Sequence, residues 1–119
     1  MGKKEGWIGV DLDGTLAEYN GWVSPTYIGP PIHKMVNRVK QWLDEGRDVR
    51  IFTARASLIS AMENNADIQD IHDAIHRWCR RWIGQIIPIT CEKDMHMEEL
   101  WDDRCVQVVL NTGLRVDGK

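Results

Sequence analysis

Acidic residues occur at two places in the sequence in a pattern that could act on an anionic group. Asp11 and Asp13 are separated by one residue and followed by Gly14, which gives the backbone the freedom to turn both carboxylates to one side. Asp102 and Asp103 form an adjacent pair near the other end of the chain. If these carboxylates meet, they form an oxygen-rich site. Mg²⁺ suits such a site because it uses few protein carboxylates, with waters and phosphate oxygens as its remaining ligands.

Two further residues suit a phosphorylated substrate. Phosphate is itself negative, so a carboxylate nucleophile can approach it only when positive charge offsets that repulsion. The cation and the ammonium group of Lys93 would do this, and the Thr53 hydroxyl can donate one more hydrogen bond. Taken singly, Thr53 is an ordinary residue at a strand end and Lys93 is a surface lysine. They indicate a phosphate site only if the fold places them beside the carboxylates.

The elements that must position these residues alternate between strand and helix. Short apolar runs predict strands at 7–10, 49–52, 86–90 and 99–101, and apolar residues at helical spacing predict helices at 32–43 and 68–82. This alternation predicts an α/β fold, a three-layer α/β/α sandwich with a mostly parallel, Rossmann-like central sheet. Ligands of such sheets bind beyond the carboxyl ends of the strands.

The candidate residues all lie at or just after a predicted strand, so the fold should gather them into one crevice. They are Asp11, Thr53, Lys93, Asp102 and Asp103. Three other segments are less regular. A loop is expected around 57–66, a tight hairpin at Asn20-Gly21, and either a strand or a helical turn at 105–110.

Length and composition set outer limits. A chain of 119 residues with 43% hydrophobic content supports one compact core, so a single domain over 1–119 is expected. The net charge of −3 gives no global attraction to polyanions. Three cysteines without a C-x-x-C pair, and no evident signal peptide, predict a reducing, cytoplasmic setting. No run approaches the roughly 18 apolar residues that span a bilayer, so no membrane partner is expected.

The segment Asp11-Leu12-Asp13-Gly14-Thr15-Leu16 resembles the first motif of the haloacid dehalogenase (HAD) superfamily, in its phosphatase branch. The other motifs follow in order. Ile51-Phe52-Thr53-Ala54-Arg55 is similar to the second, Lys93 to the third, and Trp101-Asp102-Asp103-Arg104 to the acidic fourth.

The resemblance implies a role for each of these residues. Asp11 would form an aspartyl-phosphate, while Asp13 would protonate the leaving group and then activate water. The implied substrate-binding residues are Leu12, Thr53, Ala54, Arg55 and Lys93. Mg²⁺ would be bound by Asp11, by the main-chain carbonyl of Asp13 and by the Asp102-Asp103 pair, with the direct ligand of that pair left open. Arg55 either binds substrate or pairs with a nearby acid, and Arg104 is expected to brace the acidic pair.

Members of this superfamily often carry a cap domain over the site, but the gaps at 17–31 and 56–92 are too short to hold one. A capless enzyme with a bare flap is therefore expected, and capless members often act on large substrates or borrow a cover from another subunit. Trp22 would lie on the flap, either stacking on a base or sugar or packing within the hairpin. The segments 22–25 and 111–113 also resemble small phage and prophage proteins.

The expected function is a Mg²⁺-dependent phosphatase that hydrolyses a phosphate monoester through an intermediate on Asp11. Its partner would be a phosphorylated small molecule, a nucleotide or a nucleic-acid end, and an oligomer is possible. The alternative is a non-catalytic phosphoacceptor or binding module resembling a response-regulator receiver. Receivers lack an acid two residues after the phosphorylated Asp, so Asp13 discriminates between the two readings.

Overall fold

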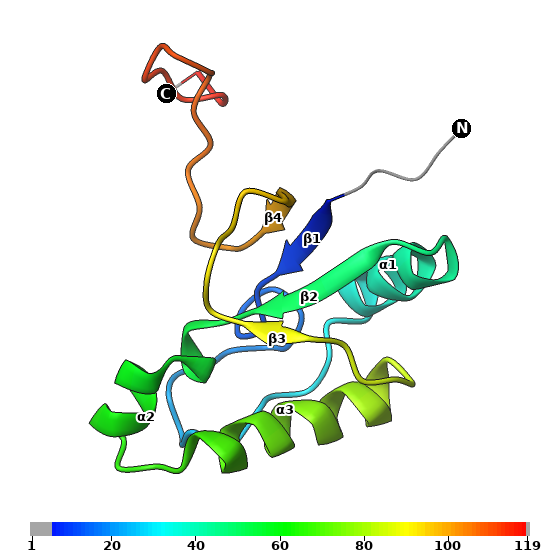
Figure 1. Ribbon diagram of the computed structural model, residues 1–119, viewed down its shortest axis with the longest axis vertical. Helices are drawn as coiled ribbons and strands as arrows, with labels where there is room; N and C mark the ends of the chain where they lie inside the picture. Colours follow the sequence, from blue (N-terminus) through cyan, green and yellow to red (C-terminus); the bar gives the residue numbers. More distant parts are fainter. Residues whose placement is uncertain (1–5, 119) are drawn as a thin grey trace.

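The computed structural model describes residues 6–118 and contains a four-stranded parallel sheet. The strands are β1 (Trp7–Val10), β2 (Asp48–Phe52), β3 (Ile89–Thr90) and β4 (Met97–Trp101), in the spatial order β3-β2-β1-β4 (Figure 1). Every pair in this sheet is parallel. The predicted α/β class and parallel sheet are confirmed, although β3 has only two residues and begins just after Pro88, whose carbonyl accepts from the Ile51 N–H of β2 at 2.8 Å.

Two long helices connect the strands. Helix α1 (His33–Asp44) joins β1 to β2, and α3 (Ile68–Trp82) lies between β2 and β3, as the apolar periodicity predicts. A 3₁₀ turn, η1 (Ala54–Ala56), and a short helix, α2 (Leu58–Glu63), precede α3. Within residues 6–118 no inserted cap domain separates these elements, and no helix of this part is long and apolar enough to cross a membrane.

Both long helices cover the same face of the sheet. Ile8 of β1 and Ile51 of β2 are fully buried in one cluster with side chains of α1 and α3. His33 of α1 contacts Trp82 of α3 edge to face, with ring centroids 6.2 Å apart, so the helices are neighbours. This follows from topology, because the two crossovers run in the same direction across the sheet and right-handed crossovers then place both helices on one side.

The opposite face of the sheet is covered differently. Trp7 is 1% exposed there, with the Arg50 guanidinium 4.6 Å from its ring centre, and its indole N–H donates to Asp94 at 2.8 Å. The connection from β3 to β4, residues 91–96, contains no helix. The described residues therefore build one helical layer, and the second helical layer of the expected sandwich is not among them.

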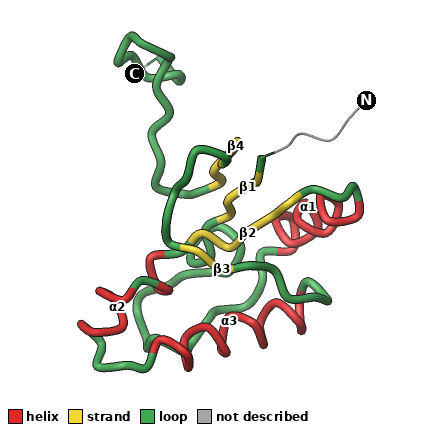
Figure 2. Tube along the Cα trace, in the orientation of Figure 1, coloured by secondary structure: helices red, strands yellow, loops and turns green. Residues whose placement is uncertain are grey.

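Three irregular segments differ from expectation. The predicted loop at 57–66 contains α2, which begins after Ser57, whose hydroxyl accepts from the Ser60 N–H at 3.0 Å. The expected hairpin at Asn20-Gly21 is an open loop (Figure 2). Residues 18–30, the flap, are closed only at their base, where the Glu18 N–H donates to the Pro30 carbonyl at 2.8 Å.

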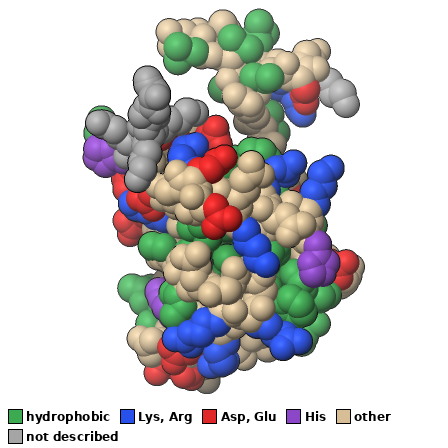
Figure 3. Space-filling model, turned by 90° about the vertical axis from the view of Figure 1, so that its right-hand side faces the viewer, with side chains coloured by type: hydrophobic (Ala, Val, Ile, Leu, Met, Phe, Trp, Pro, Cys, Tyr) green, Lys and Arg blue, Asp and Glu red, His purple; other side chains and the backbone are tan. Residues whose placement is uncertain are grey.

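The chain after β4 projects from the body as a tail. Residues 105–110 form neither a strand nor a helical turn, and a single isolated bridge joins Val108 to Arg115. The tail stands clear of the sheet, and hydrophobic side chains lie on its surface (Figures 1 and 3).

Candidate active site

The loop after β1 carries two of the candidate residues to the carboxyl end of the sheet. The Asp11 N–H donates to the Trp101 carbonyl of β4 at 2.8 Å, which extends the sheet by one residue. The loop then passes Gly14, whose φ is +92°. A Cβ at this position would lie 2.7 Å from an oxygen of Asp103. Glycine is thus required both for the backbone conformation and for the close approach to the acidic pair.

Three carboxylates meet at this edge of the sheet. Oxygen atoms of Asp11, Asp102 and Asp103 all lie within 4.8 Å of one another. The Thr15 hydroxyl donates to Asp103 at 3.2 Å and lies 3.5 Å from a carboxylate oxygen of Asp11. Asp11, Asp102 and Asp103 are here called the acidic cluster. Their carboxylates offer the hard oxygen ligands that a divalent cation such as Mg²⁺ prefers.

The acidic cluster strongly perturbs Asp11. Burial, the hydrogen bond shared with Asp103 and the negative charges of Asp102 and Asp103 together raise the pKa of Asp11 from 3.8 to about 8. Burial makes the largest contribution, and the Leu12 N–H opposes the shift. Like charges and a low dielectric both disfavour the ionised form of Asp11, so positive charge placed near the cluster would stabilise this carboxylate. A bound divalent cation would supply it, so the donor set fits such an ion both in chemistry and in charge.

Asp13 points to the other side of the loop and has a different partner. Both of its carboxylate oxygens accept from Arg55, at 2.7 Å from Nη2 and 3.1 Å from Nε. The Arg55 side chain is 3% exposed, and its Nη1 also donates to the flap carbonyls of Ser24 and Pro25, each at 2.8 Å. Arg55 further packs on the Trp22 ring, 4.6 Å from its centre. One buried guanidinium thus ties the flap to Asp13.

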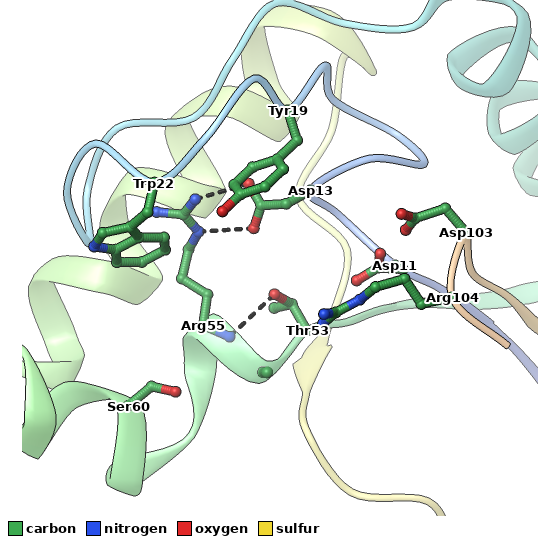
Figure 4. A pocket seen from close by; sticks show the side chains of 10 residues that line it. Asp11, Asp13, Tyr19, Trp22, Thr53, Arg55, Ser60, Asp103 and Arg104 are labelled. Carbon is green, nitrogen blue, oxygen red and sulfur yellow. Dashed lines mark hydrogen bonds and ion pairs between the residues drawn. The ribbon is translucent and has the colours of Figure 1, made fainter.

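Between the acidic cluster and the flap lies a pocket of about 220 Å³, here called the flap pocket. Asp11, Asp13, Thr53 and Arg55 line it, and the Thr53 hydroxyl accepts from the Arg55 N–H at 3.2 Å (Figure 4). The pocket combines a candidate nucleophile, a second carboxylate, a hydroxyl and cationic side chains. That combination suits a phosphate group bound next to Asp11.

Most of the predicted site residues come together here. Those that line the flap pocket are Asp11, Asp13, Thr53, Ala54, Arg55 and Asp103. Asp102 belongs to the acidic cluster instead. Of the two alternatives left open for Arg55, the ion pair with an acidic residue is present, to Asp13, and substrate binding stays a prediction for a side chain that lines the pocket.

Two predicted substrate-binding residues lie elsewhere. Leu12 is fully buried in the hydrophobic core, so its side chain does not reach the flap pocket. Lys93 is exposed on the loop after β3 and does not line the pocket either. That loop bends immediately after the strand, where the Glu92 N–H donates to the Thr90 hydroxyl at 3.0 Å. Position after a strand end was therefore not enough to bring Lys93 into the crevice.

Other pocket residues were missed as site residues. Arg104 was expected to brace the acidic pair. Its backbone N–H does donate to Asp102 at 2.8 Å, but its side chain extends into the pocket beside Thr53 (Figure 4). Ser60 enters from α2, which the sequence pattern did not reveal. Tyr19 and Trp22 also line the pocket from the flap, where Trp22 was expected either to stack on a base or sugar or to pack within the hairpin.

Comparisons with known proteins support the architecture. No protein-family model and no curated protein matches this sequence. Among solved structures, the chain is similar to a conserved protein encoded by a locus of Bacteroides thetaiotaomicron. The two are 21% identical, the match covers 85% of this chain and 78% of that chain, and the TM-score is 0.59. At this level of identity the likeness shows the fold alone, a Rossmann-like α/β fold.

Proposed function

We propose that this protein is a divalent-cation-dependent phosphohydrolase that cleaves a phosphate monoester through a covalent intermediate on Asp11. The observation that carries the proposal is the acidic cluster at the carboxyl ends of β1 and β4, beside a pocket that holds the Thr53 hydroxyl and the Arg104 side chain. The ordered resemblance to HAD phosphatase motifs supports the same reading.

Asp11, Asp102 and Asp103 would hold the cation, for which Mg²⁺ is the best candidate. When bound, it supplies positive charge that offsets the repulsion between Asp11 and a phosphate group. The resemblance also expects a ligand from the main-chain carbonyl of Asp13. The carboxylate of Asp13 is not part of the cluster, because Arg55 holds it on the pocket side.

The residues of the chain would then act in two steps. Asp13 first takes up a proton from solvent on an oxygen that Arg55 has released. A carboxylate oxygen of Asp11 then attacks phosphorus, the bond to the leaving oxygen breaks, and Asp13 gives that oxygen its proton. In the second step Asp13 takes a proton from water as the water oxygen attacks the phosphorus of the aspartyl-phosphate, which frees Asp11 and inorganic phosphate. Arg55 must release one oxygen of Asp13 for this proton transfer.

Arg104 is the best candidate for the phosphate-binding cation that Lys93 was expected to provide. It lines the flap pocket beside Thr53, whereas Lys93 does not. A guanidinium offers several N–H donors to the oxygens of a phosphate group. Arg104 and Thr53 would thus hold the phosphate while Asp11 attacks.

The second candidate is a non-catalytic phosphoacceptor resembling a receiver module. Asp11 and Asp13 line the same pocket, and a second carboxylate facing the leaving group favours turnover over storage of the phosphoryl group. Hydrolysis of an aryl phosphate with Mg²⁺ tests this directly, with EDTA treatment and Asp11→Asn as controls. Multiple turnovers abolished by both controls support the enzyme, whereas one stable phosphoryl group per chain without turnover supports the receiver-like module.

A further inference from the structure

A second concavity lies against the acidic cluster, with Asp102 and Asp103 in its wall. This α1 groove has a volume of about 340 Å³. Asp103 lines both the groove and the flap pocket, so the two hollows share a wall at the proposed reaction centre. The residues of the groove used in the argument are Thr15, Lys34, Arg38, Trp101, Asp102 and Asp103.

Two cationic side chains, Lys34 and Arg38, line this groove, and within residues 6–118 no ion pair joins either of them to an acidic residue, although Asp102 and Asp103 line the groove as well. Lys34 and Arg38 are four residues apart on α1, so they project on one side of the helix. The Arg38 guanidinium lies 4.9 Å from the centre of the Trp101 ring, and its Nη1 lies 3.5 Å from the Met35 sulfur. These contacts hold the side chain in position without an ion pair, in contrast to Arg50, which pairs with Asp48 at 2.9 Å.

The charged side chains of the α1 groove limit which groups the groove can bind. With a cation bound at the acidic cluster to offset the charges of Asp102 and Asp103, an anionic group would be attracted by Lys34 and Arg38, whereas a neutral apolar group would have to desolvate both of them. A phosphate oxygen can also accept from a guanidinium and an ammonium at once. The groove is therefore suited to an anion that belongs to the same substrate as the reacting phosphate.

We propose that the α1 groove binds a second phosphate group of the substrate, either a monoester or a diester. This inference rests on the proposed function, since it takes the flap pocket as the site of the reacting phosphate. The substrate then carries at least two phosphate groups, and its leaving group, which bears the second phosphate, extends from the flap pocket to the α1 groove. A nucleoside bisphosphate and a phosphorylated strand end share this chemistry.

The test compares three substrates that contain the same nucleoside: the 5′-monophosphate, the 3′,5′-bisphosphate and a 5′-phosphorylated dinucleotide. The wild-type protein should prefer at least one two-phosphate substrate by about tenfold or more in kcat/KM. Preference for the bisphosphate alone identifies a small molecule, and preference for the dinucleotide identifies a strand end. Equal kcat/KM for all three substrates would overturn the inference while leaving the proposed function intact.

Variants then locate the effect. Lys34→Gln and Arg38→Gln should each reduce the preference several-fold, mainly through KM, while Arg38→Lys should retain part of it. Lys40→Gln is the matched control, because it removes one exposed positive charge from the same helix outside the groove. A preference unchanged by Lys34→Gln, or reduced equally by Lys40→Gln, contradicts the groove as the binding site.

A binding measurement separates this inference from the proposed function. If no substrate turns over, the proposed function fails, and calorimetric titration of Asp11→Asn with the monophosphate and the bisphosphate in Mg²⁺ still tests the groove. About tenfold tighter binding of the bisphosphate, lost in the double variant Asp11→Asn/Lys34→Gln, supports it. Equal affinities for the two ligands overturn it.

Discussion

Asp11 and Asp13 are two residues apart, yet they belong to two regions with opposite electrostatics. Asp11 joins Asp102 and Asp103, and burial with like charge raises its pKa to about 8. Asp13 faces the flap, where Arg55 donates to both of its oxygens. The neighbouring groups, and not the residue type, therefore distinguish the two carboxylates. Asp11 has no positive partner among the acidic cluster, and a cation could supply one, whereas Asp13 already has Arg55.

The largest expected effect is on the Asp11 side. Asp11→Asn removes the nucleophile but keeps nearly the same shape, so turnover should fall by about 1,000-fold or more. The measurement is aryl phosphate hydrolysis at saturating Mg²⁺, with circular dichroism to establish that the fold survives. Residual activity in Asp11→Asn equal to that of Asp13→Asn would erase the distinction between the two carboxylates.

On the Asp13 side, Arg55→Gln should loosen the flap. The change removes the ion pair with Asp13 and the two contacts with flap carbonyls, so the free energy of unfolding should fall by about 1–3 kcal/mol. kcat/KM should fall about tenfold, because the flap and Asp13 are no longer held in place. Denaturant titration checks the stability. Arg77→Gln is the control, an exposed arginine on α3. A loss no larger than that of the control would show that Arg55 does not tie the two regions together.

The raised pKa of Asp11 also predicts how stability depends on pH in metal-free protein. The unfolded chain releases the Asp11 proton near pH 3.8 and the folded chain near pH 8. The folded state therefore binds more protons between these values, and its stability should decrease as pH rises through this window. For a half-buried carboxylate the expected loss is about 1–2 kcal/mol after solvent screening.

Denaturant titrations at pH 5 and pH 8 in EDTA, on wild type and on Asp11→Asn, isolate this contribution. The difference between the two proteins should grow toward pH 8, with Asp11→Asn the more stable there. Added Mg²⁺ should stabilise the wild type more than the variant at pH 8. A difference that does not change with pH would mean that burial and like charge do not raise the pKa of Asp11 in the folded protein.

The smallest expected effect concerns the flap surface. Trp22 is 47% exposed and lines the flap pocket, so Trp22→Ala should raise KM about three- to tenfold with little change in kcat. The check is steady-state kinetics with the best substrate found, alongside thermal melting. An unchanged KM with a lower melting temperature would assign Trp22 to packing on Arg55 alone.

Much of this architecture could be predicted because the signals are local. The buried run at 7–10 and the helical stripes at 32–43 and 68–82 report burial directly, and the rule for parallel sheets then brings Asp11, Asp13, Thr53 and Arg55 to one edge. The helix α2 escaped prediction because its large apolar residues Leu58, Ile59 and Met62 are exposed, and only the small Ala61 is buried, so its sequence shows no apolar stripe.

The remaining features depend on contacts between distant residues. The path of the flap follows from hydrogen bonds between Arg55 and carbonyls about thirty residues earlier, which outweigh the local hairpin preference of Asn20-Gly21. The positions of Lys93 and Arg104 depend on how each chain bends after its strand. No spacing pattern records that bend, so a strand-end rule selected Lys93 where the structure places Arg104 in the pocket.

The central claim is that Asp11 carries the phosphoryl group, and trapping that group tests it most directly. Asp13→Asn keeps the nucleophile but lacks the base that activates water, so an aryl phosphate should phosphorylate Asp11 and the adduct should decay slowly. Intact-protein mass spectrometry after an acid quench should show about 80 Da of added mass, the mass of one phosphoryl group, on Asp13→Asn and none on Asp11→Asn/Asp13→Asn. Peptide mapping should place it on Asp11. An adduct that persists in the double variant, or that maps to another residue, would contradict the account.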